Sequence, residues 1–394
     1  MADGMNKPAI RFAGFTDAWE QRKVQDVADR FDNLRIPVAA NLRVHGTTPY
    51  YGANGIQDYV DGFTHDGEFV LVAEDGANDL KNYPVKCVYG RIWVNNHAHV
   101  LQGKAGIADN SFLAFAISQS DIESLLVGGG RAKLNAETLM SIEFRLPCLQ
   151  EQYQIGEYLT RLDNLITLHQ REYAKLVNIK ASMLEKMFPK DGSAYPEVRF
   201  AGFTDAWEQR KLKEIADKVT EKNGNLTVRE TFTNSAEYGI ISQRDFFDHD
   251  ISNADNIGGY YVVRNEDFVY NPRISVTAPV GPINRNKLGR NGVMSPLYTV
   301  FRTHDIDTEY LEWFFKSDYW HSFMNFNGDS GARSDRFSIK DAVFFEMPIP
   351  LPSIDEQRRI GALLNQINNL ITLHQRKLEK LQNIKKSMLE KMFV

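Results

Sequence analysis

At 394 residues, the chain is long enough for two or three ordinary domains, which excludes a single small module. Its residues are 43% hydrophobic and 25% charged, as in globular proteins, and no apolar run approaches the roughly 20 residues of a membrane-spanning helix. The net charge of -5 disfavours a broadly basic nucleic-acid-binding surface, so any such surface must be local. The opening residues, MADGMNKPAI, lack the apolar stretch of a signal peptide and the chain has only two cysteines, which predicts a reducing cytoplasm.

Two segments of the chain occur twice. The string RFAGFTDAWEQRK is found unchanged at Arg11–Lys23 and at Arg199–Lys211. A longer block at Leu146–Phe188 matches Leu351–Phe393, and the strings NLITLHQR and SMLEKMF are unchanged within it. Repeats of this length are not produced by chance, so the chain contains two copies of one structural plan.

The segments between these blocks, Val24–Arg145 and Leu212–Pro350, show little identity to each other. A plain gene duplication followed by drift would spread the differences evenly, instead of leaving unchanged blocks beside dissimilar ones. The pattern therefore indicates two variable domains, at 1–148 and 199–353, each held in the same constant framework.

The repeated blocks predict long helices at 149–188 and 354–394, with a linker at 189–198 between the first helix and the second variable domain. Apolar residues recur at alternating steps of four and three, apart from the same slip near Ile179 and Ile384, which is the spacing of a coiled-coil seam. The first seam is Ile155, Leu159, Leu162, Ile166, His169, Tyr173, Leu176, Ile179, Met183 and Met187. The second is Ile360, Leu364, Ile367, Ile371, His374, Leu378, Leu381, Ile384, Met388 and Met392.

The two helices could pair with each other or with the helices of another chain. Both copies lie in one chain with a variable domain before each, so we favour an antiparallel intramolecular coiled coil with pseudo-twofold symmetry over a dimerisation coiled coil. His169 and His374 lie at equivalent seam positions, where polar residues more often set register than bind metal.

The variable segments predict a mixed α/β (α+β) fold. Short β-like runs occur at Phe69–Glu74 and Val85–Val94 in the first segment, separated by glycine-containing turns. In the second segment, similar runs at 260–263, 267–270 and 297–301 precede an amphipathic helix, TEYLEWFFKS, for which Thr308 is the expected cap.

Both variable segments end with a loop of small and basic residues, GGGRAK at Gly128–Lys133 and SGARSDR at Ser330–Arg336. Glycine and serine allow close backbone approach, and arginine and lysine can bind phosphate or guanine. The most basic polar cluster of the second segment is RNKLGR at Arg285–Arg290, and the first segment offers TTPYYGANG and NNHAH on turns. Each of these stretches taken alone is more often a solvated loop than a DNA contact.

Several catalytic motifs are missing from the sequence. Gly103-Lys104 is followed by alanine and lacks the upstream glycine of a phosphate-binding loop, so ATP hydrolysis is not expected. The string YNPRI has Arg273 where the catalytic motif of an adenine methyltransferase has its second proline. His97 and His99 have the spacing of strand ligands but no third ligand beside them, so alternate exposed strand residues are expected and a metal site is not.

Two variable domains, each followed by a long helix with an LPxxxEQxxI entry and an NLITLHQR body, resemble the specificity subunit of type I restriction-modification systems. The resemblance covers nearly the whole chain, and YYGANGI, VLVAEDG and GGGRAKLNAETL are similar to target-recognition domains of that family. It implies a non-catalytic subunit that reads a bipartite DNA site, one half per domain, with the helix pair setting the spacer.

The same resemblance implies partners and cofactors outside this chain. Two adenine methyltransferase subunits that use S-adenosylmethionine would dock on the duplicated blocks, and two restriction/translocase subunits that use ATP and Mg²⁺ would join them. No cofactor or metal is expected on this chain, and it would contribute no catalytic residue.

These implications give two sets of candidate residues. The expected partner-docking residues are Phe15, Trp19, Phe203, Trp207, His169 and His374. The expected DNA contacts of the first domain are Thr47, Thr48, Tyr50, Tyr51, Asn54, Lys81, Arg91, His97, Arg131 and Lys133. Those of the second domain are Arg244, Arg273, Arg285, Asn286, Lys287, Arg290, Arg333 and Arg336.

Two alternatives remain open from the sequence. One is a structural adaptor whose duplicated helices bind proteins and whose variable domains bind no DNA. The other is a fused nuclease or methyltransferase with an atypical active site in one variable domain. Neither accounts as directly for identical blocks beside dissimilar inserts.

Overall fold

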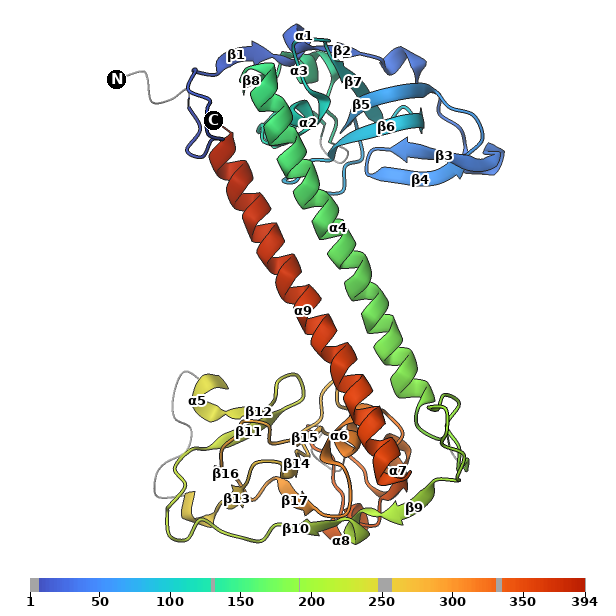
Figure 1. Cartoon of the computed structure of the whole chain (residues 1–394), viewed down its shortest axis with the longest axis vertical. Coiled ribbons are helices and arrows are strands. Elements are labelled where there is room, and N and C mark those ends of the chain that lie inside the picture. The colour runs from blue at the N-terminus through green and yellow to red at the C-terminus, as the bar shows by residue number, and fades with distance from the viewer. Residues whose placement is uncertain (1–6, 129–131, 191, 247–256, 331–334, 394) are drawn as a thin grey trace. The chain divides into compact units, whose positions relative to one another are not determined.

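The computed structural model describes residues 7–128, 132–190, 192–246, 257–330 and 335–393, and the chain divides into two compact units. Unit 1 comprises residues 1–171 and 375–394, and unit 2 comprises residues 172–374. Each unit thus contains one variable domain together with one end of each long helix, as can be followed by the labels of Figure 1.

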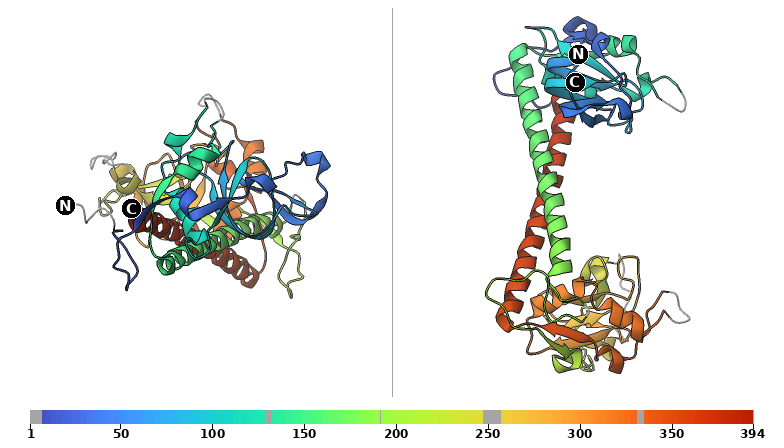
Figure 2. Two further views of the ribbon diagram at one scale, coloured as in Figure 1. Left: turned by 90° about the horizontal axis from the view of Figure 1, so that it is seen from above. Right: turned by 90° about the vertical axis from the view of Figure 1, so that its right-hand side faces the viewer.

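The two long helices are α4 (Leu149–Lys186) and α9 (Ile354–Met392). In unit 1 the first turns of α4 pack into the same core as the last turns of α9, and in unit 2 the last turns of α4 join the first turns of α9. The helices therefore run antiparallel within each unit, side by side in both views of them (Figure 1, Figure 2). All predicted seam residues are buried or half-buried, which confirms the seam.

Unit 1 is built on a six-stranded sheet in the order β2-β7-β5-β6-β3-β4. Neighbouring strands are antiparallel except β3 and β6, and the apolar helix α2 packs on β5, β6 and β7. The elements are β2 Ala28–Arg30, β3 His45–Gly52, β4 Gly55–Val60, β5 His65–Ala73, β6 Val85–Val94, β7 Ala98–Gly103, α1 Val24–Val27, α2 Asn110–Ser118 and α3 Ala136–Ser141. The β-like runs predicted near β5 and β6 are confirmed.

Unit 2 has a four-stranded sheet, β10-β17-β14-β15, and two small ladders, β11-β12 and β13-β16. Its strands are β10 Ala216–Lys218, β11 Phe232–Ser235, β12 Gly239–Ser242, β13 Tyr261–Val263, β14 Phe268–Tyr270, β15 Ile283–Arg285, β16 Gly292–Met294 and β17 Thr299–Thr303. Its short helices are α5 Gln243–Phe246, α6 Thr308–Lys316, α7 His321–Asn327 and α8 Asp341–Phe344. The three predicted runs correspond to β13, β14 and β17.

The predicted cap of α6 is wrong by one residue. The helix begins at Thr308, but the capping side chain is Asp307, which accepts a hydrogen bond from the Tyr310 backbone N–H. The Thr308 hydroxyl instead bonds Glu266 and Arg285. A carboxylate before the first helical residue satisfies the free N–H groups of the first turn at least as well as a hydroxyl does.

Each RFAGFTDAWEQRK string ends in a strand that pairs with the strand leading into the next long helix. In unit 1, β1 (Glu20–Lys23) pairs with β8 (Glu143–Leu146), which leads into α4. In unit 2, β9 (Glu208–Lys211) pairs in the same way with β18 (Pro348–Leu351), which leads into α9. The two ladders have the same register and therefore form the same frame around both variable domains.

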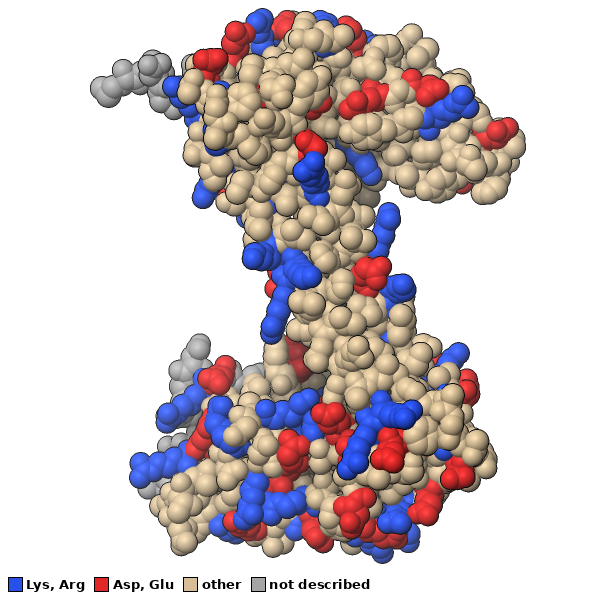
Figure 3. All heavy atoms as spheres, in the orientation of Figure 1, with Lys and Arg blue, Asp and Glu red and all other residues tan. Residues whose placement is uncertain are grey.

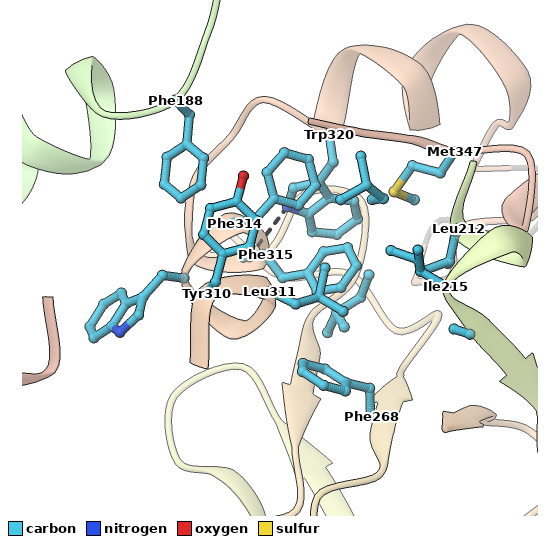
Figure 4. Packing of buried hydrophobic residues seen from close by; sticks show 14 of the residues in the cluster. Phe188, Leu212, Ile215, Phe268, Tyr310, Leu311, Phe314, Phe315, Trp320 and Met347 are labelled. Atoms are coloured by element: carbon cyan, nitrogen blue, oxygen red, sulfur yellow. Dashed lines mark hydrogen bonds between the residues drawn. The ribbon is translucent and has the colours of Figure 1, made fainter. Parts of the chain in front are cut away.

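Aromatic side chains close the core between this frame and the variable domain. In unit 2, Phe188 at the end of α4 lies against Tyr310 and Phe314 of α6, as Figure 4 shows. In unit 1, Phe393 after α9 packs on Phe112 of α2 at a ring separation of 5.5 Å. The unchanged string SMLEKMF thus completes a core in both units.

Candidate nucleic-acid interface

A buried ion pair ties each repeated N-terminal string to the start of a long helix. The Arg11 guanidinium donates two hydrogen bonds to the Glu151 carboxylate, at 2.6 and 2.7 Å. Arg199 and Glu356 make the same bidentate pair at 2.7 and 2.8 Å. Both carboxylates are fully buried, and the hydrogen bonds to them raise the pKa of each arginine. We call these two pairs the frame clamps.

The glutamine that follows each clamp carboxylate fixes the variable domain to its helix. Gln152 accepts from the Asp109 backbone N–H at 2.9 Å, and Gln357 accepts from the Asp307 N–H at the same distance. Asp109 and Asp307 in turn cap α2 and α6. The frame therefore positions α2 and α6 through equivalent contacts, which the sequence indicated only as a repeated Glu-Gln pair.

Backbone hydrogen bonds join the two sides of the predicted GGGRAK loop in unit 1. Val127 and Lys133 exchange two backbone hydrogen bonds of 2.9 Å, and the Lys133 ammonium lies 2.9 Å from Glu74 at the end of β5. Burial would raise the pKa of Glu74, but hydrogen bonds from Arg35 and Lys133 outweigh it and lower the pKa. Lys133 thus anchors the loop, and Arg131, the other basic candidate, lies outside the described residues.

The SGARSDR loop of unit 2 is closed in a similar way. Asp329 and Ser338 exchange two backbone hydrogen bonds. The backbones of Arg336 and Arg273 form an isolated antiparallel β-bridge. The buried Nε of Arg336 has no hydrogen-bond partner within the described residues, while Arg273 is exposed. Arg333 lies outside the described residues. The described ends of the two predicted loops therefore lie at equivalent places along the chain, before the short helix and the strand that lead into each long helix.

Two of the DNA-contact candidates in the first domain are buried side chains that stabilise the domain. Tyr50 is 1% exposed, its hydroxyl bonds the Val38 backbone, and Arg43 covers its ring. Tyr51 is also buried, and burial raises its pKa. The prediction of DNA contact is wrong for both tyrosines, because Tyr51 is buried in a core cluster with Phe69 and Leu71, and the buried ring of Tyr50 is covered by Arg43. Thr47 is exposed and Thr48 is half-buried on the same strand.

The other first-domain candidates lie on turns and at strand ends. Asn54 is exposed, but its side chain joins the β3–β4 turn to the backbone of Gly76 and Asn78. Lys81 is exposed, and Arg91 is exposed beside Asp66 at 3.3 Å. These positions remain available to a ligand.

The two histidines near the first sheet differ in exposure. His97 is 35% exposed and contacts Asp75 at 2.5 Å. His99 is 1% exposed, with its two ring nitrogens 2.7 Å from Asp32 and 2.9 Å from the Leu134 carbonyl. The expectation that both are exposed strand residues is therefore wrong for His99, which links the sheet to the segment after the loop.

In unit 2 the RNKLGR cluster is partly structural. Arg285 is 5% exposed and lies 2.7 Å from both Glu266 and Glu312. Asn286 is fully buried and donates to the carbonyls of Arg264 and Arg290. Neither can contact DNA, so both predictions are wrong.

The remaining candidates of unit 2 are exposed. Arg290 makes a bidentate pair with Glu230, and Lys287 lies 3.2 Å from Glu312. Arg244 is exposed on α5. On the face of unit 2 seen in Figure 3, Lys and Arg side chains are interspersed with Asp and Glu side chains. A DNA surface here must therefore be a local selection of cations and cannot be a uniform basic face.

The docking candidates fall into two groups. Trp19 and Trp207 are buried against Phe112 and Phe188, so the prediction that they dock a partner is wrong. Their indole Nε1 atoms have no hydrogen-bond partner in the described part of the chain. The other four candidates are half-buried at the surface, and they are Phe15, Phe203, His169 and His374.

Two structural features are absent from the described ranges. Within them, no group of three or more His, Cys, Asp or Glu side chains is placed to hold a metal ion. None of the helices in those ranges combines the length and apolar composition needed to span a lipid bilayer.

Comparison with known proteins places these features in a family. The family described as the type I restriction modification DNA specificity domain matches residues 16–178 and 204–383, and so covers both units and most of the chain. A Haemophilus influenzae protein named as type I restriction enzyme specificity subunit S.HindORF215P is 44% identical over 146 residues. That match spans 37% of this chain and 38% of the relative.

Two longer matches extend over most of the chain. The type I restriction enzyme MjaVIII specificity subunit of Methanocaldococcus jannaschii is 24% identical over 312 residues, 73% of this chain and 70% of the relative. The crystal structure of the type I restriction-modification S subunit from M. genitalium has the same fold, with a TM-score of 0.64 at 12% identity over 98% of this chain and 99% of that one. With both of its units matched, the chain belongs to the type I restriction-modification DNA specificity family.

Proposed function

We propose that this chain reads a bipartite DNA site, one half with each unit, and directs adenine methylation and restriction by partner subunits. The observation that carries the proposal is the pair of frame clamps. Arg11–Glu151 and Arg199–Glu356 have the same geometry, yet the domains that they hold differ in strand number and in exposed side chains. A constant frame with two different exposed surfaces suits a protein that presents two different sequence readers to one duplex.

In this proposal the chain itself has no catalytic residue. Two methyltransferase subunits would supply S-adenosylmethionine and flip the target adenine, and two restriction/translocase subunits would supply ATP and Mg²⁺. The antiparallel helices α4 and α9 would set the spacer between the half-sites.

Exposed leucines on the long helices support docking of two identical partners. Leu165 and Leu168 in unit 1, and Leu370 and Leu373 in unit 2, are exposed and belong to the unchanged string NLITLHQR. Two copies of one partner require two copies of one surface, which explains why apolar residues are kept there. The Leu168→Glu variant should bind one methyltransferase copy in place of two by mass measurement, whereas Gln170→Glu on the same helix should bind both.

The test of the whole proposal is genome-wide mapping of N6-methyladenine after co-expression of this chain with its methyltransferase. We expect a gapped motif methylated on both strands. Exchange of residues 24–145 should alter one half of the motif, and exchange of residues 212–350 should alter the other. A complex that forms but methylates no such motif would favour the non-DNA adaptor.

A further inference from the structure

Two equivalent lysines on the long helices differ in their partners. Lys385 of α9 lies in unit 1 at 2.5 Å from the Asp163 carboxylate of α4. Its ammonium is 5.6 Å from the centre of the Phe115 ring on α2. This lysine is therefore neutralised by an acid from the neighbouring helix.

The matching lysine in unit 2 has no such acid. Lys180 of α4 donates to the Asn368 side-chain oxygen at 3.0 Å and lies 5.8 Å from the Trp313 ring of α6. Asn368 occupies the position that Asp163 holds in the other repeat. Among the described residues, no carboxylate forms an ion pair with Lys180, and burial lowers its pKa. Among the several differences between the two matched blocks, the change from Asp163 to Asn368 thus leaves this lysine without an ion pair among the described residues of unit 2.

A second lysine, Lys316, is close enough to Lys180 for their charges to interact, and it lines a pocket of about 510 Å³ that Lys180 does not line. Lys316, at the end of α6, donates to the Asn284 side-chain oxygen at 2.5 Å, and no carboxylate within the described ranges forms an ion pair with it. Asn284 is 4% exposed and is itself held by Asn234 at 2.6 Å, so its oxygen has a fixed direction. The pocket also contains Thr277, Ser317, His321 and the last turns of α4.

Among the described residues, both lysines lack an ion pair, although acidic side chains also lie close to Lys316. Burial lowers the pKa of Lys316, the charge of Glu312 opposes this shift, and the charges of Lys287 and Lys180 each lower the pKa by a smaller amount. Two acids, Glu185 and Asp318, also line the pocket, and Lys190 lies 3.9 Å from Glu185. A bound anion would relieve the repulsion between the lysines, whose direct partners are neutral amides.

We propose that Lys180 and Lys316 form a contact for a backbone phosphate of DNA on unit 2, with Asn368 and Asn284 leaving both ammonium groups available. The proposal rests on the DNA-reading function given above and names one contact within it. DNA is favoured over a partner protein because a partner present in two copies would need the same charge in both units. In unit 1, the Asp163 carboxylate neutralises the equivalent lysine, Lys385, so the two units do not present the same charge.

The test is the salt dependence of DNA binding by the complex of this chain with its methyltransferase, followed by fluorescence anisotropy. One duplex contains the methylated motif and one lacks it. Each phosphate contact contributes about 0.9 to the slope of log K against log salt, or about a threefold difference between roughly 50 and 200 mM salt. Lys180→Gln and Lys316→Gln should each reduce the slope by about that amount and weaken both duplexes alike.

Matched variants separate this site from general charge. Lys385→Gln, in which the lost lysine was already paired, should leave the slope at the wild-type value. Asn368→Asp should lower the slope as Lys180→Gln does, although it retains the lysine and the packing. Unchanged melting temperatures would confirm that these variants fold.

The proposal is overturned if Lys180→Gln and Lys316→Gln keep the wild-type slope, or if Lys385→Gln lowers it equally. It is also overturned if the two variants bind DNA normally but lose the methyltransferase. Failure of the wild-type complex to bind either duplex would instead contradict the DNA-reading function itself, before any variant is compared.

Discussion

At the scale of single residues, the frame clamps are the contacts on which the repeated architecture depends. A bidentate guanidinium–carboxylate pair is stronger than a neutral hydrogen bond and fixes the orientation of both side chains. Because Glu151 and Glu356 are buried, removal of the charge from either leaves a guanidinium without its partner in a largely dry site.

Glu151→Gln should lower the free energy of unfolding by about 3 kcal/mol, because a buried charge loses its counter-charge. Glu157→Gln is the matched control, since Glu157 makes an exposed pair with Arg161 one helical turn away, and it should cause no measurable change. Urea unfolding followed by circular dichroism distinguishes the two. Equal stability of the two variants would contradict the clamp.

Glu74 gives a pH-dependent test of the loop anchor. Its pKa is lowered in the folded state, so its contribution is present above the pKa of the unfolded chain and is lost as pH falls through the folded pKa. Glu74→Gln should therefore be less stable than the wild type near neutral pH, and the difference should shrink as acid is added. Unfolding curves at several pH values measure it, and a difference that grows in acid would contradict the prediction.

At the scale of elements, each long helix crosses the capped end of a shorter helix at a glycine. A Cβ built on Gly156 would lie 2.6 Å from the Asp109 carboxylate oxygen and 2.9 Å from the Phe112 nitrogen. A Cβ built on Gly361 would have more room, because it would lie 3.0 Å from the Glu309 Cβ and 3.2 Å from the Tyr310 nitrogen. The close approach explains why the repeat keeps glycine inside a helix despite its low helix propensity.

Gly156→Ala should therefore destabilise the chain by about 1 to 3 kcal/mol, as overpacking does. Gly361→Ala should be nearly neutral, because the gain of about 1 kcal/mol in helix propensity offsets the milder contact. Thermal unfolding of the two variants side by side tests this order, which would be refuted by a more stable Gly156→Ala protein.

At the scale of the whole molecule, each unit is completed by segments from both repeats. Phe188 after α4 is 1% exposed in the core of unit 2, and Phe393 after α9 is half-buried in unit 1. The backbone repeats this pattern, since the Val198 N–H bonds the Lys186 carbonyl at 2.9 Å and the Ile10 N–H bonds the Lys391 carbonyl at 3.0 Å. Each unit thus depends on residues far away in the sequence.

Phe188→Ala should cost about 3 to 5 kcal/mol and should lower hydrogen-exchange protection in unit 2 before unit 1. Phe393→Ala should cost less, because part of its ring stays in water, and its effect should appear first in unit 1. Exchange measured peptide by peptide locates each loss. If protection is lost first in the unit that does not contain the substituted phenylalanine, the prediction that each ring stabilises mainly its own unit is wrong.

The sequence alone determined the repeated frame, the two long helices and their seam. Heptad spacing and string identity are local properties, so Leu149 and Ile354 could be placed at the helix starts without any tertiary information. Several β-strands were also predictable, because apolar runs such as Val85–Val94 are bounded by turn residues.

Only the tertiary structure decided which polar side chains reach the surface. In the sequence, Arg285 and Asn286 have side chains that could hydrogen-bond to base edges. In the structure both are buried, and the Arg285 guanidinium is paired with Glu312, which is distant in the sequence. The same holds for the unequal charge of Lys180 and Lys385, which are one residue type in one repeated block. Their difference arises only when the opposite helix brings Asn368 to one and Asp163 to the other, because burial and ion pairing depend on partners that are far apart along the chain.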